Sequence, residues 1–325
     1  MKSLLCVEYG PPEKLVIREI DAPSPGTGEI RIIMHAAGLN FPDGLIIQNL
    51  YQFKPALPFT PGGEAAGVIE AIGDGCGGLA VGDRVAVMTR WGAFAERVIA
   101  PASSAVKLPA EMPYDEGAAF GMTYGTAYHA LVQRADLKSG ETLLVLGAAG
   151  GVGLAAVEIG KALGARVIAA ASSPEKLLLA REHGADEIID YSTADLKAAA
   201  KALTGGQGVD VVFDPVGDRF AEPALRSIKW GGRYLVVGFA AGAIPHPPLN
   251  LVLLKSAAII GVFWGAWADR EPANNQNNMR SLLDLYSNGR IRPHVSRSYP
   301  LADGAAAIRW LLDRKALGKI VLTAG

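Results

Sequence analysis

The sequence predicts an α/β protein in which a β-rich module precedes a doubly wound parallel sheet. The first 120 or so of the 325 residues are rich in Gly and Pro and have little helical periodicity, which favours strands joined by tight turns. From about Tyr114 onward, Ala-rich helical patterns alternate with apolar runs, as in a parallel sheet covered on both faces. A glycine-rich turn stands where the first of these strands meets the helix that follows it.

The β-rich module is expected to contain short strands separated by turns. Apolar runs predict strands at 29–37, 65–73 and 83–88. Four glycines between Gly73 and Gly78 mark a tight turn. The apolar run after Met1 is too short for the core of a signal peptide, so a first strand is expected there.

The second part of the chain alternates strands and helices in a regular order. Helix 174–183 has the fullest pattern, because Ser172-Ser-Pro offers an N-cap with Pro in the first turn and Gly184 ends the helix. Residues 274–278, Asn-Asn-Gln-Asn-Asn, are expected to form a polar loop or a helix start. The other strands are expected at 142–146, 166–170, 187–190, 209–214, 234–238, 257–263 and 319–323, and the other helices at 152–163, 194–203, 279–287 and 305–314.

The composition argues against several classes of protein. A formal net charge of −1 argues against nucleic acid or an anionic membrane as the main partner. Two cysteines, Cys6 and Cys76, cannot form a disulfide framework or a four-cysteine zinc site. No apolar stretch is long enough to span a bilayer. We therefore expect a cytoplasmic chain.

The turn Gly147–Gly153, Gly-Ala-Ala-Gly-Gly-Val-Gly, has the pattern of a dinucleotide pyrophosphate site. A buried strand, the glycine-rich turn and a helix N-terminus follow one another in the required order. Glycines let the backbone approach the phosphates, and the free N–H groups of the helix face their negative charge. The expected phosphate contacts are Ala149, Gly150, Gly151 and Val152.

Six segments match motifs of one enzyme superfamily: Ala36-Ala-Gly-Leu-Asn-Phe-Pro-Asp, Pro61-Gly-Gly-Glu-Ala-Ala-Gly, Gly147-Ala-Ala-Gly-Gly-Val-Gly, Ala185-Asp-Glu-Ile-Ile-Asp-Tyr, Asp214-Pro-Val-Gly and Gly318-Lys-Ile-Val-Leu. By these the chain resembles medium-chain dehydrogenase/reductases, and within them the zinc-independent NADPH:quinone oxidoreductase (zeta-crystallin-like) family. The resemblance implies a GroES-like catalytic domain and a Rossmann cofactor domain. We expect residues 1–123 and a return segment, 266–325, in the former, and 124–265 in the latter.

The resemblance also bears on zinc. The positions of the zinc ligands in the superfamily's alcohol dehydrogenases match Asn40, Gly63 and Met122 of this chain, and none of these supplies a thiolate or an imidazole. The five histidines lie far apart, without the spacing of a ligand set. We expect no metal site.

The segment after the second strand of the cofactor domain favours NADPH. NAD enzymes place an acid there for the ribose hydroxyls, whereas this chain has Ala171-Ser-Ser and no acid before Glu175. Ser172 and Lys176 can bind a 2′-phosphate, and the resemblance adds Tyr191. The alternative is that a serine only caps the helix and Lys176 is solvated.

Further cofactor contacts come from the resemblance. It places Asn40 and Thr126 near the nicotinamide ribose and amide, and four apolar residues along the pocket. The carboxyl ends of parallel strands are where ligands bind, which independently favours positions 216, 239 and 263. For the side chains of Phe239 and Phe263, core packing is the favoured alternative. The four pocket residues are Val216, Phe239, Phe263 and Trp264.

The cofactor carries the hydride chemistry, so the protein has to orient the reactants and polarise the substrate. Candidate hydrogen-bond donors are Asn40, Tyr51 and Tyr124. Tyr51 is alternatively a surface loop aromatic. Asp43 is expected to be a loop acceptor and Glu64 a structural residue. Trp91 and Trp264 are either an aromatic wall for a planar substrate or core residues.

Three functions remain open. The leading one is transfer of hydride from NADPH to a quinone without a metal. The second is reduction of the carbon–carbon double bond in enones or acryloyl thioesters, and the third is a non-enzymatic cofactor-binding scaffold. The expected partner is a small-molecule electron acceptor, a quinone or an enone. The resemblance also implies a homodimer that pairs the strands near 257–263 across a two-fold axis.

Overall fold

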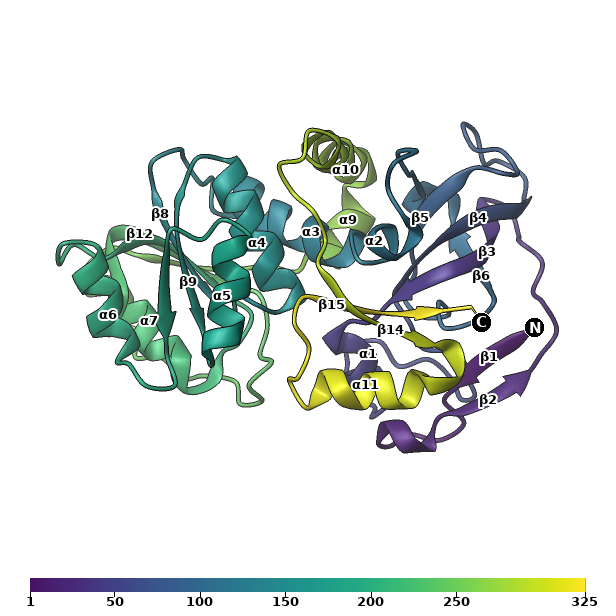
Figure 1. Ribbon diagram of the computed structural model, residues 1–325, viewed down its shortest axis with the longest axis horizontal. Coiled ribbons are helices and arrows are strands. Elements are labelled where there is room, and N and C mark those ends of the chain that lie inside the picture. The colour runs from purple at the N-terminus through teal and green to yellow at the C-terminus, as the bar shows by residue number, and fades with distance from the viewer. Residues whose placement is uncertain (325) are drawn as a thin grey trace. The chain divides into compact units, whose positions relative to one another are not determined.

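The computed structural model describes residues 1–324 (Figure 1). Contacts divide the chain into two units. One combines Met1–Met122 with the segment that begins at Pro293, and the other is Thr123–Arg292. None of the helices among the described residues is both long and apolar enough to pass through a bilayer.

The first unit is built on a seven-stranded sheet of order β14-β15-β3-β4-β5-β7, in which β6 also pairs with β3, and a separate pair β1-β2. Its strands are β1 (Lys2–Leu5), β2 (Val16–Glu19), β3 (Glu29–Gly38), β4 (Glu64–Ile72), β5 (Arg84–Met88), β6 (Arg97–Pro101), β7 (Val106–Lys107), β14 (Val295–Pro300) and β15 (Lys319–Thr323). Its helices are α1 (Phe41–Ile46), α2 (Tyr114–Ala118) and α11 (Gly304–Leu312).

Strand β15 joins the end of the chain to the β-rich module. It runs antiparallel to β3, with Val321 opposite Gly38, so the last strands lie beside an early one in Figure 1. Fully buried Ile32, Phe94 and Leu322 belong to one apolar core that forms around this sheet. The pairing carries Lys319 to the carboxyl end of β3, where the first candidate site residues begin.

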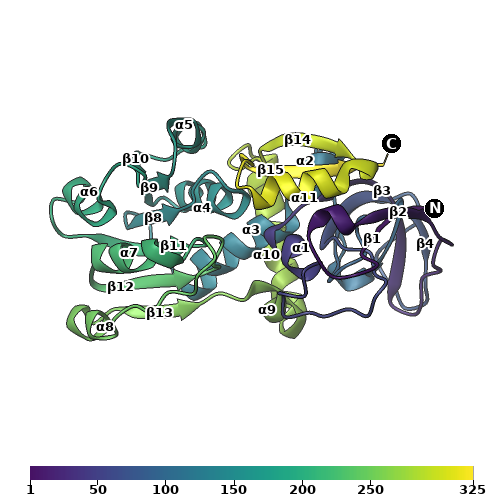
Figure 2. The ribbon, with the colours of Figure 1, turned by 90° about the horizontal axis from the view of Figure 1, so that it is seen from below.

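The second unit is a six-stranded parallel sheet of order β10-β9-β8-β11-β12-β13, which is visible edge-on in Figure 2. This order is that of a doubly wound dinucleotide-binding sheet. The strands are β8 (Thr142–Leu146), β9 (Arg166–Ala171), β10 (Glu187–Asp190), β11 (Val209–Asp214), β12 (Ile228–Val236) and β13 (Ala258–Gly261). The helices are α3 (Gly121–Tyr128), which starts just before the unit, α4 (Gly151–Ala162), α5 (Pro174–Glu182), α6 (Leu196–Leu203), α7 (Ala221–Ser227), α8 (Asn250–Lys255), α9 (Trp264–Arg270) and α10 (Pro272–Ser287).

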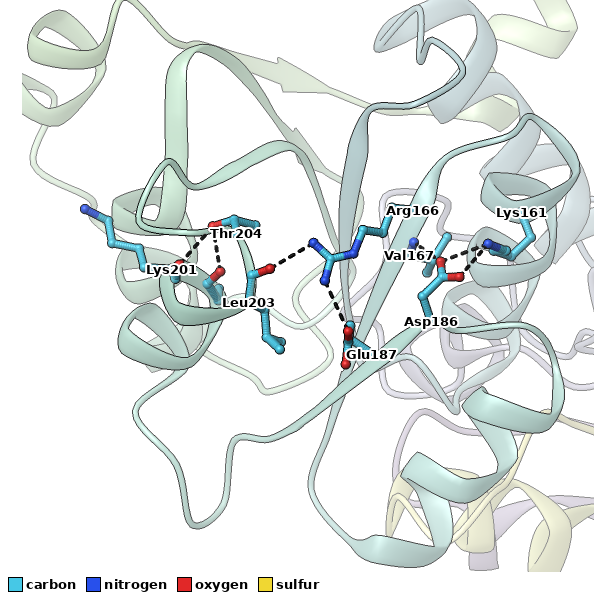
Figure 3. Close-up of polar contacts among 9 residues, drawn as sticks. Lys161, Arg166, Val167, Asp186, Glu187, Lys201, Leu203 and Thr204 are labelled. Atoms are coloured by element: carbon cyan, nitrogen blue, oxygen red, sulfur yellow. Dashed lines mark hydrogen bonds and ion pairs between the residues drawn. The ribbon is translucent and has the colours of Figure 1, made fainter.

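Polar contacts link the elements at the amino ends of the strands of this sheet (Figure 3). Arg166, the first residue of β9, donates to the carbonyl oxygen of Leu203 at 2.8 Å and to Glu187 Oε1 at 3.1 Å. Lys161 Nζ lies 2.7 Å from Asp186 Oδ1. These contacts tie β9, β10 and two helices together at the end opposite to the carboxyl ends of the strands.

The α/β class and most predicted elements are confirmed, with differences at several positions. Strand β12 begins at Ile228, six residues before the strand predicted at 234–238. The strand predicted at 257–263 is shorter, since β13 covers only Ala258–Gly261. The asparagine-rich segment 274–278 lies in the first turns of α10, which is the helix-start alternative. Strand β14 was not predicted, because its sequence Val-Ser-Arg-Ser-Tyr-Pro is polar and mostly exposed, as in an edge strand.

The return to the first unit begins at Pro293 in the division by contacts, whereas the sequence placed it at residue 266. Side-chain contacts hold the intervening helices within the second unit. Trp264 Nε1 donates to Asn275 Oδ1 at 3.1 Å, and Gln133 Nε2 donates to Asn278 Oδ1 at 2.9 Å. The boundary at residue 266 was implied by the family resemblance and not by a pattern in this segment.

Candidate functional site

The glycine-rich turn leaves β8 at the position that the sequence predicts. Gly147 adopts a φ of +58°, and the Gly150 N–H donates back to its carbonyl oxygen at 2.9 Å. Helix α4 then starts at Gly151. A Cβ on Gly153 would lie 2.2 Å from the Gly147 carbonyl oxygen, so only glycine allows this close packing of helix on turn. The first N–H groups of α4 have no intrahelical acceptors and stand at the positive end of its dipole, which fits a pyrophosphate.

The turn after β11 packs directly on this cradle. A Cβ on Gly147 would lie 2.9 Å from Val216 Cγ2. The buried Asp214 carboxylate holds this turn by accepting the N–H groups of Val216 at 2.7 Å and Gly217 at 2.8 Å, and it also accepts the Tyr234 hydroxyl. Burial raises the pKa of Asp214, and burial together with Asp214 raises the pKa of Tyr234. Val216 is therefore placed beside the glycine turn by an internal polar network.

Ser172, Lys176 and Tyr191 occupy neighbouring positions at the carboxyl ends of β9 and β10. Ser173 is the N-cap of α5, since its Oγ accepts the Lys176 N–H at 3.4 Å. Exposed Ser172 instead accepts from Lys176 Nζ, also at 3.4 Å. The Tyr191 N–H donates to the carbonyl oxygen of Ala171 at 3.1 Å, which puts Tyr191 next to the end of β9. The capping alternative therefore applies to Ser173 and not to Ser172.

The predicted pocket aromatics differ in exposure. The core-packing alternative for two of them is wrong, because Phe239 is 37% and Phe263 51% exposed. Phe239 comes three residues after the end of β12, and Phe263 comes two residues after the end of β13. Trp264 is 4% exposed and lies against α3, where a Cβ on Gly125 would meet Trp264 Cζ2 at 2.5 Å. Thr126 is partly buried on the same helix.

Three buried polar side chains meet in the first unit. Lys319 Nζ donates to Asn40 Oδ1, to Glu64 Oε1 and to the Leu39 carbonyl oxygen, each at 2.7 Å. Asn40 Nδ2 donates to the same Glu64 Oε1 at 2.7 Å. Glu64 Oε2 accepts the Met122 N–H at 2.9 Å. The expectation that Glu64 is structural agrees with these contacts, and both ends of the Asn40 amide are engaged within the chain.

Asp43 lies at the edge of this group. Its Oδ2 accepts the Asn40 N–H at 2.7 Å, so Asp43 is an acceptor as expected, but it stands in the first turn of α1 and not in a loop. Burial raises the pKa of Asp43 to about 7, while the Asn40 N–H and the Lys319 ammonium oppose the rise and Glu64 adds to it. Burial and Asp43 together raise the pKa of Tyr51, which packs on the core of the unit and makes an edge contact with Phe53.

The positions that match zinc ligands in the superfamily come together here. A Cβ on Gly63 would lie 3.4 Å from Met122 Cε, and Asn40 and Met122 both bond to Glu64. Among residues 1–324, no cluster of three or more His, Cys, Asp or Glu side chains has the arrangement of a metal site. The donors present are an amide, a thioether and a backbone glycine, which do not make a tetrahedral zinc set.

Tyr124 belongs to another buried network in the second unit. Its hydroxyl donates to Glu158 Oε2 at 2.5 Å, and Glu158 Oε1 lies 2.6 Å from His183 Nδ1. Sequence reasoning gave no role to Glu158 or to Lys319. A signal existed for Glu158, a single carboxylate among the apolar residues of helix 152–163. Lys319 carried no such signal, because its partners lie far away in the sequence.

Family models match both units. Residues 26–110 match the alcohol dehydrogenase GroES-like domain, and residues 151–287 match the zinc-binding dehydrogenase family. Quinone oxidoreductase-like protein 2 of Rattus norvegicus is 37% identical over 99% of this chain and 92% of its own length. Quinone oxidoreductase of Homo sapiens is 33% identical over 99% of this chain and 97% of its length.

Solved structures agree in fold over the whole chain. The quinone oxidoreductase of Escherichia coli complexed with NADPH has a TM-score of 0.92 at 31% identity, covering 99% of this chain and all of the other. A mycobacterial protein complexed with NADPH has a TM-score of 0.93 at 32% identity, with the same coverage. The GroES-like and Rossmann assignments are thus confirmed, and the chain belongs to the quinone oxidoreductase family of the medium-chain dehydrogenase/reductases.

Proposed function

We propose that the protein is an NADPH-dependent oxidoreductase that transfers hydride to a quinone without bound zinc. The observation that carries this proposal is the group formed by Ser172, Lys176 and Tyr191 at the carboxyl ends of β9 and β10, beside a glycine cradle. A cation and a hydroxyl fit a 2′-phosphate, and there is no carboxylate before Glu175 to repel it. Relatives in complex with NADPH support the same cofactor.

The residues of the second unit bind and orient the cofactor in this proposal. NADPH supplies the hydride when bound. The N–H groups at Gly151 and Val152 hold the pyrophosphate, together with Ala149 and Gly150, and the Asp214 network holds Val216 against the turn. Thr126, Phe239, Phe263 and Trp264 remain proposed contacts of the nicotinamide half.

The reaction needs little acid–base chemistry from the protein. A quinone that accepts a hydride becomes a hydroquinone anion, and solvent supplies the proton that completes the reduction. We propose Tyr51 as the hydrogen-bond donor to the substrate oxygen, because a phenolic hydroxyl is a donor that stays protonated at neutral pH. Tyr124 is less suited, since its hydroxyl donates to Glu158, and Asn40 is proposed to face the nicotinamide side.

Independence from zinc rests on the contacts of the matched positions. Lys319 and Glu64 engage the Asn40 amide, while Gly63 and Met122 offer no imidazole or thiolate. Activity should therefore be unchanged after dialysis against a strong chelator, with metal content measured by atomic emission. Loss of activity that returns with zinc would contradict this part of the proposal.

The direct test is NADPH oxidation by the purified protein with a panel of quinones, enones and acryloyl thioesters. The proposal expects turnover with quinones. Turnover confined to carbon–carbon double bonds would replace it by an enoyl-type reductase working from the same cradle. Binding of NADPH without turnover on any acceptor would replace it by a cofactor-binding scaffold.

We also propose a cytoplasmic homodimer. Strand β13 is an edge of the parallel sheet, next to α8 (Figure 2), and Leu253, Leu254 and Ile259 are exposed there. An exposed apolar edge strand is suited to pairing with a second copy. Both cysteines are free thiols, which agrees with a reducing compartment. Sedimentation velocity tests the dimer, and a charged substitution at Ile259 should yield monomers; imaging of a tagged chain tests the location.

A further inference from the structure

Lys319 is a fully engaged buried cation in the first unit. Its side chain is 5% exposed and that of its partner Glu64 is 2% exposed. An ammonium has three N–H donors, and Lys319 has three oxygen acceptors at 2.7 Å. Glu64 is equally engaged, through Oε1 to Lys319 and Asn40 and through Oε2 to the Met122 N–H. Every polar atom of this pair has a partner.

This pair fixes the orientation of one side chain. The Asn40 carboxamide has its oxygen against the Lys319 ammonium and its NH2 group against the Glu64 carboxylate. A half-turn of the amide would bring NH2 against the ammonium and the oxygen against the carboxylate. In a site shielded from water both contacts would be repulsive, so one amide orientation is strongly preferred.

We propose that Lys319 is a positioning residue for hydride transfer, which with Glu64 holds the Asn40 amide in a single orientation. The inference rests on the proposed function, in which Asn40 faces the nicotinamide. It also accounts for the position of the pair. Lys319 comes from the C-terminal strand β15, Glu64 starts β4, and Asn40 follows β3, so the three meet only when the return strand is in place.

A purely structural ion pair makes a different prediction. Removing one partner of a buried pair strands the other charge and destabilises the fold, whereas replacing both by neutral groups is often tolerated. If Lys319 acted only through stability, the double variant Glu64→Gln/Lys319→Met would recover both stability and activity. If the charges orient Asn40, the double variant recovers stability but not activity, because neutral neighbours allow both amide orientations.

The experiment compares Lys319→Met, Glu64→Gln, the double variant and Asn40→Ala in the full-length protein. Tm measures stability, and kcat and KM are measured with NADPH and a quinone accepted by the wild type. Arg233→Met is the matched control, because Arg233 forms a partly buried pair with Glu141 through two bonds of 2.8 and 2.6 Å in the second unit. It should lower Tm without changing KM for NADPH.

We expect Lys319→Met to lower Tm and to reduce kcat/KM by about 100-fold, the usual effect of a misplaced reacting group. The double variant should regain the wild-type Tm within a few degrees and still lose about 10-fold or more in kcat/KM. If Lys319→Met does not fold, the double variant alone decides. Wild-type kcat/KM in the double variant would overturn the proposal.

Asn40→Ala separates this inference from the proposed function. A loss in Asn40→Ala without a loss in the double variant would refute the positioning role and leave the function intact. Unchanged kinetics in Asn40→Ala would remove Asn40 from the site, and the positioning role with it. If the wild type turns over no acceptor, the proposed function is refuted. The positioning role is then judged by NADPH binding, and it is refuted as well if the wild type and the double variant have the same Kd for NADPH.

Discussion

The polar cluster of Asn40, Glu64 and Lys319 and the glycine turn after β8 differ in whether their polar groups have hydrogen-bond partners within the chain. In the cluster, a buried ammonium, a carboxylate and an amide satisfy one another through bonds of 2.7 Å. In the turn, the N–H groups that begin α4 have no intrahelical acceptor, and Ser172 and Lys176 lie nearby with partial exposure to solvent. A region that satisfies its own polar groups holds other residues in place, whereas a region that leaves donors unsatisfied is ready to bind an anion.

The largest effect is expected from Gly153→Val, which places a side chain against the glycine turn. A Cβ here would lie 2.2 Å from the Gly147 carbonyl oxygen, so the turn must open. We expect the affinity for NADPH to fall by more than about 100-fold, since several backbone bonds to the pyrophosphate are lost together. Calorimetric titration with NADPH measures it, and circular dichroism checks the fold.

Gly261→Ala is the control for this variant, because a Cβ on Gly261 meets nothing within 4 Å. Its affinity for NADPH should equal that of the wild type. Normal binding by a folded Gly153→Val protein would show that the turn is not the phosphate site.

Asp43, which accepts the Asn40 N–H, provides a test of the polar cluster of Asn40, Glu64 and Lys319. Its pKa is raised from 3.8 to about 7, so between these values the folded protein keeps a proton that the unfolded chain releases. The contribution of Asp43 to the free energy of unfolding is therefore largest below about pH 4 and is lost as pH rises through 7. The slope is at most about 1.4 kcal/mol per pH unit. Asp43→Asn should remove this contribution to the slope.

Urea unfolding of the wild type and Asp43→Asn between pH 4 and pH 8 measures the effect. The variant should gain stability relative to the wild type as pH rises, because neutral Asn escapes the cost of a buried charge. A constant difference between the two proteins across this range would mean that Asp43 titrates at its ordinary pKa.

Lys176→Ala tests whether Ser172 and Lys176 select NADPH over NADH. Loss of a charge-assisted contact with the 2′-phosphate should raise KM for NADPH by about 10-fold and leave KM for NADH within about 2-fold of the wild type. Initial rates with both cofactors at fixed acceptor give the comparison. Equal changes for the two cofactors would contradict the assignment of Lys176 to the 2′-phosphate.

Arg166→Ala should have the smallest effect, because Arg166 lies at the amino ends of the strands, opposite to the proposed cofactor residues (Figure 3). Its contacts with Leu203 and Glu187 are partly exposed, so we expect a loss of about 1 kcal/mol in the free energy of unfolding. Kd for NADPH should not change. A weaker Kd would mean that the two edges of the sheet are coupled.

Local patterns in the sequence were sufficient for the cofactor sheet. Strand and helix positions followed from apolar periodicity, and the turn at Gly147–Gly153 required glycine for a close approach that the structure contains. The segment after the second strand placed Ser172 and Lys176 at the end of β9, whereas Tyr191 was added by the family resemblance. These features depend on neighbours within a few residues, so their signals are local.

The exposure of Phe239 and Phe263 and the role of Lys319 were beyond such reasoning. An apolar side chain after a strand is buried or exposed according to what covers that edge, which its own segment does not encode. Lys319 and Glu64 are 255 residues apart in the chain. No periodicity links them, and the match of Gly318-Lys-Ile-Val-Leu to the family carried no statement of its partner.

The sequence alone predicted the two-part fold, the glycine-rich turn between strand and helix, the absence of an acid before Glu175 and the lack of zinc-type ligands at the matched positions. Only the tertiary structure decided that Asn40, Glu64 and Lys319 form one buried group, and that Ser173 rather than Ser172 caps α5. The reason is physical. Periodicity and turn chemistry act over a few residues, whereas buried charges are paired by whichever distant strands the sheet brings together.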